Sequence, residues 1–326
     1  MCKISILVPV YGVEDYIERC SRSLFEQTYL DMEFVFVDDF TPDKSLDILK
    51  YVMKDYPERE HCVKIISHDR NKGLAAARNT CLDNASGEFV CFVDSDDWLE
   101  KDAIQTLVKK QVETKADLVF GSRCEHRSDG VVEIRYPNVE KSQRVALNLD
   151  GDYMPLTGAI IRLSLFEEHA IRCIEGFNMA EDVRLICLLS YFADIMLSCD
   201  NLTYHYDKNN PNSVMHEAQD KNKVLKNTYK NLQNKLSILD FFSDKEKQFY
   251  EKAVEMTVRQ LKIVLKQALK RRNKQTFYDI VSIIDAHPDI VEAIQWKRSG
   301  LNGFWCRNFA LSEIVFQVNR IIKIKK

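Results

Sequence analysis

Short apolar runs alternate with helical patterns over the first 120 residues, and this alternation limits the fold more than any other feature of the chain. Each run has the length of one buried strand, and the segments between the runs carry apolar residues at helical spacing. We expect strands at Ile4–Val10, Glu33–Val37, Val63–Ser67, Phe89–Val93 and Leu118–Phe120. Strands joined by helices in this order form a mostly parallel sheet with helices on both faces. The sequence therefore predicts an α/β fold of the Rossmann type.

The character of the sequence changes near residues 215–220 to long helical patterns rich in lysine. We expect one domain at residues 1–215 and a helical extension at residues 216–326. Thr41 and Pro42 predict a helix start in the first part, and Ser243–Glu246 has the capping-box pattern of a helix start in the second. One apolar helical face is expected after it, formed by Tyr250, Val254, Val258, Leu261, Leu265 and Ala268.

Charge and cysteine content exclude several classes of protein. Lys and Arg total 46 against 49 for Asp and Glu, so the net charge of -3 gives no overall field that attracts nucleic acid. The ten cysteines have no CxxC spacing, which favours reduced thiols in the cytoplasm over a zinc site or disulfides. No run of about 18 apolar residues occurs, so we expect no transmembrane helix.

Acidic residues follow two of the expected strands at the point where each strand ends. Asp38–Asp39 follows the second strand and Asp94–Asp97 follows the fourth. In an open parallel sheet, ligands bind outside the carboxyl ends of the strands, so the two clusters indicate one ligand crevice. The alternative is that these residues only cap the helices that follow. That alternative suits Asp43 and Asp102 better than the dense cluster after the fourth strand.

The motifs around these acidic residues resemble the family-2 glycosyltransferases, mostly inverting enzymes of bacterial polysaccharide assembly with the GT-A fold. The resemblance is carried by five blocks in the family's order and spacing: Ile4–Tyr11, Val37–Asp39, Asn71–Asn79, Ala85–Glu88 and Phe92–Trp98. The resemblance is close over about the first hundred residues and looser up to Met215. It implies a GT-A-like α/β domain that binds a nucleotide-sugar donor.

The resemblance implies a base site at the end of the first strand. Pro9, Val10 and Tyr11 would hold the nucleotide base, with the ring of Tyr11 as a stacking face. Asp39 would accept a hydrogen bond from the base edge. A carboxylate acceptor suits a base with an N–H at that edge, such as uracil, so UDP is the expected nucleotide.

The resemblance also implies residues beside the donor's diphosphate. The positive charges of Lys72 and Arg78 would complement the phosphates. For Arg78 a salt bridge on the helix surface is an equal alternative. Asp94 and Ser95 would contact the nucleotide sugar.

A metal ion is expected at the acidic cluster. A hard cation, Mn²⁺ or Mg²⁺, bound by Asp94 and Asp96 would offset the charge of the diphosphate. His205 would complete the metal shell or contact the diphosphate, and the alternative is a histidine packed at a strand end.

The resemblance implies a general base in the acidic pair of the segment Met179–Arg184. Asp182, the second member of the pair, would take the proton from the acceptor hydroxyl as that hydroxyl attacks the anomeric carbon. A single base on the face opposite the leaving group gives inversion. The other interpretation is a helix N-terminus, where Glu181 and Asp182 meet the helix dipole favourably. A helix start that faces the crevice would satisfy both interpretations.

The sequence departs from the family pattern at three places. Gly12 stands at the usual asparagine, Phe40 stands at the usual glycine, and Met154–Ile160 lacks the usual Trp and Lys. The first two changes leave the acidic residues intact. The third concerns the acceptor side, so the acceptor is the part of the function that this sequence specifies least.

The C-terminal segment that begins near Phe304 has an apolar helical face and a basic end at Lys323–Lys326. It could lie on an anionic membrane and bring the protein to a lipid-linked acceptor at the inner face of the cell membrane. The alternative is a terminal helix that packs on the protein.

Together these features predict an inverting transferase that moves a hexose or N-acetylhexosamine from a UDP-sugar to a saccharide or lipid-linked oligosaccharide in cell-surface polysaccharide synthesis. Two rival functions are a catalytically silent nucleotide-sugar-binding assembly partner and a sugar-phosphate nucleotidyltransferase. The second needs a glycine-rich phosphate loop after the first strand, where this sequence has only Gly12.

Overall fold

The computed structural model describes residues 3–151, 154–178, 180–211, 224–290 and 293. The chain divides into two compact units, which are described separately. The first comprises the described residues of Met1–Asn148 and Asp152–His216, and the second those of Leu149–Gly151 and Glu217–Lys326.

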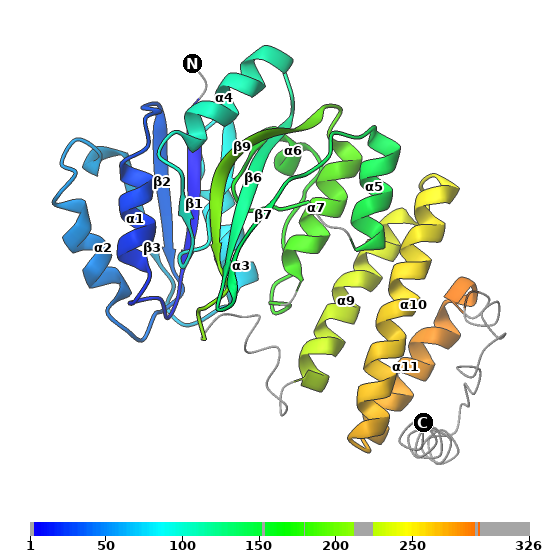
Figure 1. Cartoon of the computed structure of the whole chain (residues 1–326). Helices are drawn as coiled ribbons and strands as arrows, with labels where there is room; N and C mark the ends of the chain where they lie inside the picture. Colours follow the sequence, from blue (N-terminus) through cyan, green and yellow to red (C-terminus); the bar gives the residue numbers. More distant parts are fainter. Residues whose placement is uncertain (1–2, 152–153, 179, 212–223, 291–292, 294–326) are drawn as a thin grey trace. The chain divides into compact units, whose positions relative to one another are not determined.

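The first unit is an α/β structure whose elements follow the order that the sequence predicts up to β4 (Figure 1). Its strands are β1 (Ile4–Val10), β2 (Met32–Asp38), β3 (Val63–Ser67), β4 (Phe89–Phe92), β5 (Trp98–Leu99), β6 (Leu118–Arg127), β7 (Gly130–Ile134), β8 (Ala159–Arg162) and β9 (Met196–Asp207). Its helices are α1 (Ile17–Phe25), α2 (Ser45–Met53), a 3-10 turn at Glu60–Cys62, α3 (Leu74–Asp83), α4 (Ala103–Thr114), α5 (Lys141–Asp150), α6 (Leu163–Glu168) and α7 (Glu181–Phe192).

The strands form one sheet in the order β3-β2-β1-β4-β8-β6-β9-β5, with β7 added to β6. The first four strands are parallel, as the alternation of strands and helices predicts. Beyond β4 the sheet is mixed, because β8 runs antiparallel to both of its neighbours and β5 runs antiparallel to β9. The expectation of a mostly parallel sheet therefore holds for one half of the sheet only.

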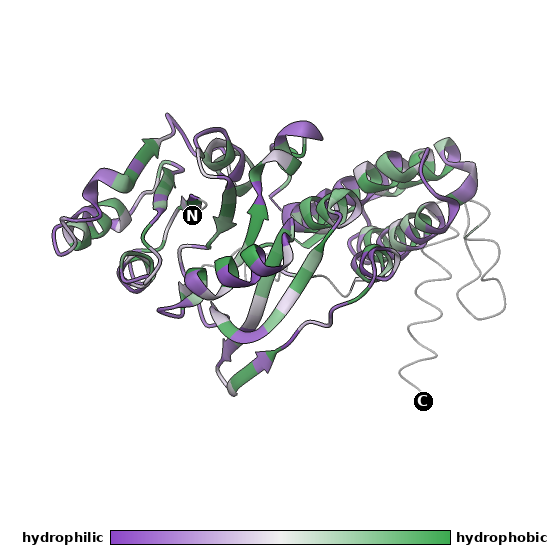
Figure 2. Cartoon of the chain, turned by 90° about the horizontal axis from the view of Figure 1, so that it is seen from above, coloured by the Kyte–Doolittle hydropathy of each residue, from purple (hydrophilic) through white to green (hydrophobic). Residues whose placement is uncertain are grey.

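The central strands are buried along their whole length and mostly apolar, because both of their faces are covered. Every residue of β1, β2 and β4 is buried, whereas the edge strand β3 is partly exposed. Side chains alternate between the two faces of a strand. Those of Ile4, Ile6 and Val8 join a core with α1, α2 and α4, and α3 packs on β1 and β2. In Figure 2 the helices carry both hydrophobic and hydrophilic colours, as amphipathic helices do.

The buried carboxylate of Glu33 connects several segments at the start of the sheet. Glu33 on β2 accepts hydrogen bonds from the Ser5 hydroxyl and from the Ser86 backbone N–H, and it forms ion pairs with Lys3 and Lys64. Although burial opposes ionisation, these donors lower the pKa of Glu33 to about 2. Its carboxylate therefore stabilises the junction between β1, β2 and the turn before β4.

Two helix starts differ from the sequence prediction. Helix α2 begins at Ser45 rather than after Thr41, because Asp43 accepts hydrogen bonds from the Thr41 hydroxyl and from the Ser45 backbone N–H. In the second unit no capping box forms at Ser243, whose hydroxyl instead donates to the Asp240 carbonyl.

The second unit contains α9 (Val224–Phe242), α10 (Lys247–Lys270) and α11 (Lys274–Ala286). Helix α10 packs against both other helices. The predicted apolar face of α10 is confirmed by the burial of Val254, Val258, Leu261 and Ala268. Among the described residues, no helix is long and apolar enough to cross a membrane.

Candidate active site

The carboxyl ends of β1, β2 and β4 are neighbours, because β1 pairs in parallel with both other strands. Asp38 ends β2, and Asp94 follows β4 by two residues. Tyr11 lies at the end of β1 between them. The expected shared edge of the sheet is present, with one acidic cluster on each side of the end of β1.

Of the three residues predicted to hold the base, only Tyr11 offers its side chain to a ligand. Pro9 and Val10 are buried within β1, so a ligand could meet only their backbone. The side chain of Tyr11 is 49% exposed. A second exposed ring, that of Phe40, follows β2 and is 59% exposed. The two segments are joined by a hydrogen bond from the Gly12 N–H to the Thr41 hydroxyl, 2.9 Å long.

Asp39 is buried and anchors the loop before α3. Its two carboxylate oxygens accept the backbone N–H groups of Lys72 and Gly73 at 2.8 and 2.7 Å, and one of them also contacts His68 Nδ1 at 2.7 Å. This loop therefore lies at the end of β2, beside the predicted base site. A role of Asp39 in contacting a base edge stays a prediction, and the structure adds this structural role.

The position of Gly73 requires a glycine. Its φ is +90°, and the side chain of Asn178 fills the space that a Cβ would occupy. Asn178 also accepts the backbone N–H of Ala75 at 3.1 Å and so covers the N-terminus of α3. The loop before α3 is therefore packed against the segment that leads to α7. Lys72 is partly exposed in this loop, and its Nζ lies 3.3 Å from Asp69.

The acidic loop after β4 is held in place by its last carboxyl group. Asp97 is fully buried and accepts hydrogen bonds from the Tyr204 hydroxyl and from the Asp207 backbone N–H. Burial and the charges of Asp96 and Asp94 raise the pKa of Asp97 well above its usual range. Asp97 is thus a structural member of the cluster, and strand β9 supplies both of its donors.

The other members of the acidic loop are more accessible, apart from Ser95, which is buried. The side chain of Asp94 is 31% exposed. Asp96 is partly buried and accepts a hydrogen bond of 2.8 Å from Asn210. Burial and the charge of Asp94 raise the pKa of Asp96 to about 6. The loop therefore holds two carboxylates close together, with a ligand-accessible side.

Arg78 is 3% exposed, so it does not form the helix-surface salt bridge that was its alternative role. A charge contact between Arg78 and the diphosphate stays a prediction. Its Nη2 lies 2.8 Å from Asp94 Oδ1, and its Nη1 lies 3.1 Å from Glu181 Oε1. Arg78 therefore connects the acidic loop to the acidic pair that begins α7.

The acidic pair divides into one buried and one exposed carboxyl group. Glu181 and Asp182 are the first residues of α7, where carboxylates meet the helix dipole favourably. Glu181 is buried, and this burial raises its pKa to about 7 although the charge of Arg78 lowers it. Asp182 is exposed, and its only described hydrogen bond comes from the N–H of Val183 next to it. Asp182 is therefore free to meet an acceptor hydroxyl.

His205 packs among neighbouring side chains, and its role as a metal ligand stays a prediction. Successive side chains of a strand point to opposite faces. Tyr204 on β9 contacts the acidic loop, while His205 stacks on Trp98 with ring centroids 4.7 Å apart. The ring nitrogens of His205 face Glu100 at 2.7 Å and His126 at 3.0 Å. Its packing at the sheet edge explains this histidine, which was the alternative interpretation.

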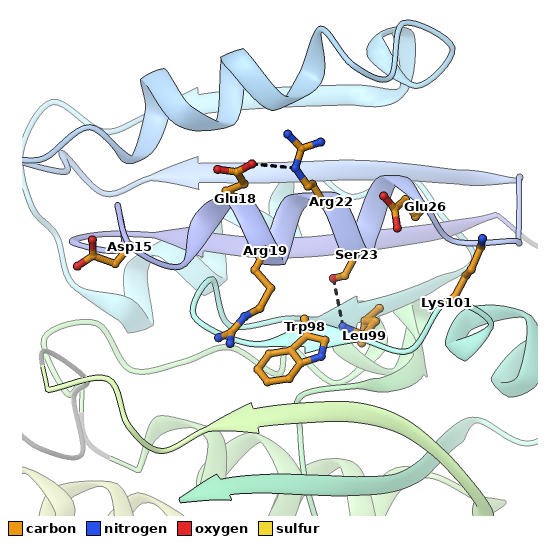
Figure 3. Close-up of a pocket in the computed structure, with 9 residues that line it drawn as sticks. All are labelled: Asp15, Glu18, Arg19, Arg22, Ser23, Glu26, Trp98, Leu99 and Lys101. Atoms are coloured by element: carbon orange, nitrogen blue, oxygen red, sulfur yellow. Dashed lines mark hydrogen bonds and ion pairs between the residues drawn. The ribbon is translucent and has the colours of Figure 1, made fainter. Parts of the chain in front are cut away.

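An open groove of about 630 Å³ lies beside the acidic loop, between α1 and the segment of β5 (Figure 3). Arg19 is one of the residues that line it, with its guanidinium 3.7 Å from the ring centre of Trp98. Arg19 also donates to the Asp96 carbonyl and to the Asp207 carboxylate. None of the expected donor-binding residues lines this groove.

Sequence reasoning missed several of these residues. Arg19 and Asn210 contact the acidic loop but come from distant segments that match no motif, and Tyr204 contacts the loop from the position just before His205. Phe40 did give a signal, because it departs from the family pattern. The basic C-terminal segment that was predicted to contact a membrane lies outside the described residues.

Comparison with known proteins agrees with this geometry. The family model "Glycosyl transferase family 2" matches residues 5–170. The chain belongs to this glycosyltransferase family.

Similar proteins include GlyA, a glycosyltransferase of Streptococcus pneumoniae, which is 47% identical over 120 residues, or 37% of this chain and 16% of GlyA. A poly(ribitol-phosphate) beta-glucosyltransferase of Bacillus spizizenii is 40% identical over 121 residues, or 36% of this chain and 19% of the relative. The chain thus matches less than a fifth of the length of either relative.

Solved structures confirm the GT-A fold. Staphylococcus aureus TarS 1-349, solved with UDP-GlcNAc, has a TM-score of 0.66 at 21% identity, and the match covers 85% of this chain and 79% of TarS 1-349. A mannosyltransferase of Pyrobaculum calidifontis, solved with GDP-Man and Mn²⁺, has a TM-score of 0.56 at 13% identity over 98% of this chain and 87% of that protein.

Proposed function

We propose that this protein transfers a hexose or N-acetylhexosamine from a UDP-sugar to a glycan or lipid-linked acceptor, with inversion, in cell-surface polysaccharide synthesis. The observation that carries the proposal is the contact between the two acidic motifs. The buried guanidinium of Arg78 contacts both Asp94 of the acidic loop and Glu181, the neighbour of Asp182. A donor's diphosphate and an acceptor's hydroxyl would meet at this place.

The residues of the acidic loop fit a divalent metal ion. Asp94 and Asp96 provide carboxylate oxygens, the ligands that Mn²⁺ and Mg²⁺ prefer. No third His, Cys, Asp or Glu joins them in a metal-binding group within the described part of the chain. Such a pair suits an ion that takes its other ligands from phosphates and water. The ion would offset the charge that the diphosphate gains as it leaves.

The chain's own residues would perform the proton transfer and the orientation. Asp182 would accept the proton of the acceptor hydroxyl while the oxygen of that hydroxyl bonds to the anomeric carbon and the bond to the diphosphate breaks. Attack opposite the leaving group inverts the anomeric carbon. Asp182 would be kept in position for this step because Glu181, its neighbour in the first turn of α7, contacts Arg78.

UDP is the proposed nucleotide. Two residues support this choice. Asp39 could accept a hydrogen bond from a base N–H, and the exposed ring of Tyr11 could stack on the base. TarS 1-349, one of the neighbours with this fold, was solved with UDP-GlcNAc. We place the reaction in the cytoplasm, at the inner face of the membrane where a lipid-linked acceptor would lie.

A donor screen tests this proposal. UDP-, GDP- and dTDP-sugars are incubated with the protein, with Mn²⁺, with Mg²⁺ or with a chelator, and the released nucleotide is measured. We expect hydrolysis of a UDP-sugar that depends on the metal. Metal-dependent hydrolysis of a GDP-sugar alone would overturn the choice of nucleotide. Binding of a UDP-sugar without hydrolysis, and without transfer to any glycan offered, would support a silent binding protein instead.

The backbone conformation and the exposed ring of Phe40 lead to a separate prediction about the base site. Its φ of 59° lies in the left-handed region, which costs a residue with a side chain about 1 kcal/mol. Its exposed ring could stack on a base, and such stacking contributes about 1–3 kcal/mol. We expect Phe40→Gly to raise the free energy of unfolding by up to about 1 kcal/mol and to weaken UDP binding about fivefold or more. Urea unfolding and calorimetric titration with UDP measure the two effects.

Phe40→Ala is the matched control for this prediction. It removes the ring but keeps a side chain in the left-handed conformation, so UDP binding should weaken without the gain in stability. Unchanged affinity for UDP in both variants would show that the ring does not contact the base.

A further inference from the structure

Arg78 differs from another buried arginine of the same unit in the groups it contacts. Arg59 is also buried, and its guanidinium donates to four backbone carbonyls, those of Phe25, Gln27, Tyr29 and Leu30. Arg78 contacts two carboxylates instead, those of Asp94 and Glu181. Arg59 therefore fixes a loop, whereas Arg78 joins side chains of two motifs that lie far apart in the sequence.

The surroundings of Arg78 imply that its removal would destabilise the protein. A buried guanidinium requires opposite charge close by, and so does a buried carboxylate. Glu181 is buried, so the loss of Arg78 would leave its carboxyl group without a counter-charge. Asp94 is partly exposed and would lose the contact that fixes its Oδ1. The loss of Arg78 would therefore disturb both the acidic loop and the start of α7.

The guanidinium is also not fully satisfied. Its Nε and Nη1 are buried and make no hydrogen bond, since the contact of Nη1 with Glu181 is close but poorly aligned. A purely structural arginine usually has its donors paired, as buried polar groups generally do. The position of Arg78 is therefore set by the two carboxylates and not by a complete hydrogen-bond network.

We propose that Arg78 is a positioning residue that holds the metal-binding carboxylate Asp94 and the base Asp182 in one frame, through its contacts with Asp94 and with Glu181. This inference rests on the proposed function. Arg78 itself touches neither the metal nor the acceptor in this scheme. It orients Asp94 directly, and it orients Asp182 by fixing the first residue of α7.

The experiment compares Arg78→Met and Arg78→Lys with Arg59→Met as the matched control. Three quantities are measured: the dissociation constant of UDP in the presence of Mn²⁺, kcat of donor hydrolysis and of transfer at saturating donor, and amide hydrogen exchange of residues 181–186 in the metal-free protein. Thermal unfolding gives the folded fraction of each variant.

We expect Arg78→Met to weaken Mn²⁺-dependent UDP binding about tenfold and to lower kcat about a hundredfold. Amide exchange at the start of α7 should become faster in the same variant. Arg78→Lys, which keeps the charge, should recover part of both losses. Arg59→Met should lower the unfolding temperature but leave the dissociation constant and kcat within about twofold of the wild type.

The inference would be overturned by an Arg78→Met protein that is less stable yet keeps wild-type UDP affinity, kcat and exchange at α7. If Arg78→Met does not fold, Arg78→Lys decides: wild-type values in all three measurements reject the inference, and a loss of both UDP affinity and kcat supports it. Failure of the proposed function is seen separately, because the wild-type protein itself would then show no metal-dependent hydrolysis.

Discussion

Asp182→Asn is expected to lower the rate of transfer to a true acceptor by about a thousandfold. An amide has nearly the shape of the carboxylate but cannot accept the proton of the acceptor hydroxyl, and general bases contribute about 10²–10⁴-fold. Asp182 is exposed at the start of α7, so the substitution should leave the fold intact. The measurement is kcat with saturating donor and acceptor, together with the KM for the donor, which should stay close to its wild-type value.

The control for this prediction is Asp31→Asn, which changes another exposed aspartate, just before β2. Its kcat should equal that of the wild type. Transfer at the wild-type rate by Asp182→Asn would remove Asp182 from the mechanism and leave the acidic pair with only its role as a helix start.

Asp96→Asn is expected to abolish metal-dependent donor hydrolysis and at the same time to make the metal-free protein more stable. Burial and the neighbouring Asp94 raise the pKa of Asp96 to about 6. A folded-state pKa above the unfolded one means that the folded protein prefers the protonated group, so the ionised carboxylate opposes folding as the pH rises through about 6. The neutral amide avoids this cost and can still accept the hydrogen bond from Asn210. We expect a gain of about 1–3 kcal/mol in the free energy of unfolding at pH 7.5.

Glu33→Gln is a control with the opposite expected effect on stability. The pKa of Glu33 is lowered to about 2, so its carboxylate stabilises the fold at neutral pH. This variant should be less stable than the wild type and should hydrolyse the donor at the normal rate. Urea unfolding without divalent metal and nucleotide release with Mn²⁺ are the measurements. Metal-dependent hydrolysis that survives Asp96→Asn would reject Asp96 as a ligand, and a loss of stability would reject the electrostatic argument.

The sequence predicted the parallel half of the sheet because each of its strands is buried on both faces and is followed by a helix. It did not predict the mixed half. β5, Trp98–Leu99, has only two residues, and β8, Ala159–Arg162, has only four, which is too short for a periodic signal. Their place in the sheet depends on pairing with β9, β6 and β4, and these pairings leave no local pattern.

The site was predicted as a set of motifs, and the contacts between the motifs were not. The acidic residues could be found because carboxylates after buried strands are unusual. The burial of Arg78 could not, since its partner Glu181 lies more than a hundred residues further along the chain. The packing of His205 on Trp98 could not be predicted either, because the resemblance gives the segment but not which neighbours each side chain meets.

The contacts of Asp97 have a consequence for the order of folding. Tyr204 and Asp207, which hold the acidic loop, follow Asp97 by more than a hundred residues. Contacts between such distant segments form late, because a long stretch of chain must first be ordered. A growing chain that has just passed Trp98 carries the five motif blocks of the first hundred residues, but it lacks the two residues that hold the acidic loop. We therefore expect the ability to bind a nucleotide to arise only after β9 has joined the sheet, so that half-made chains would not capture donor.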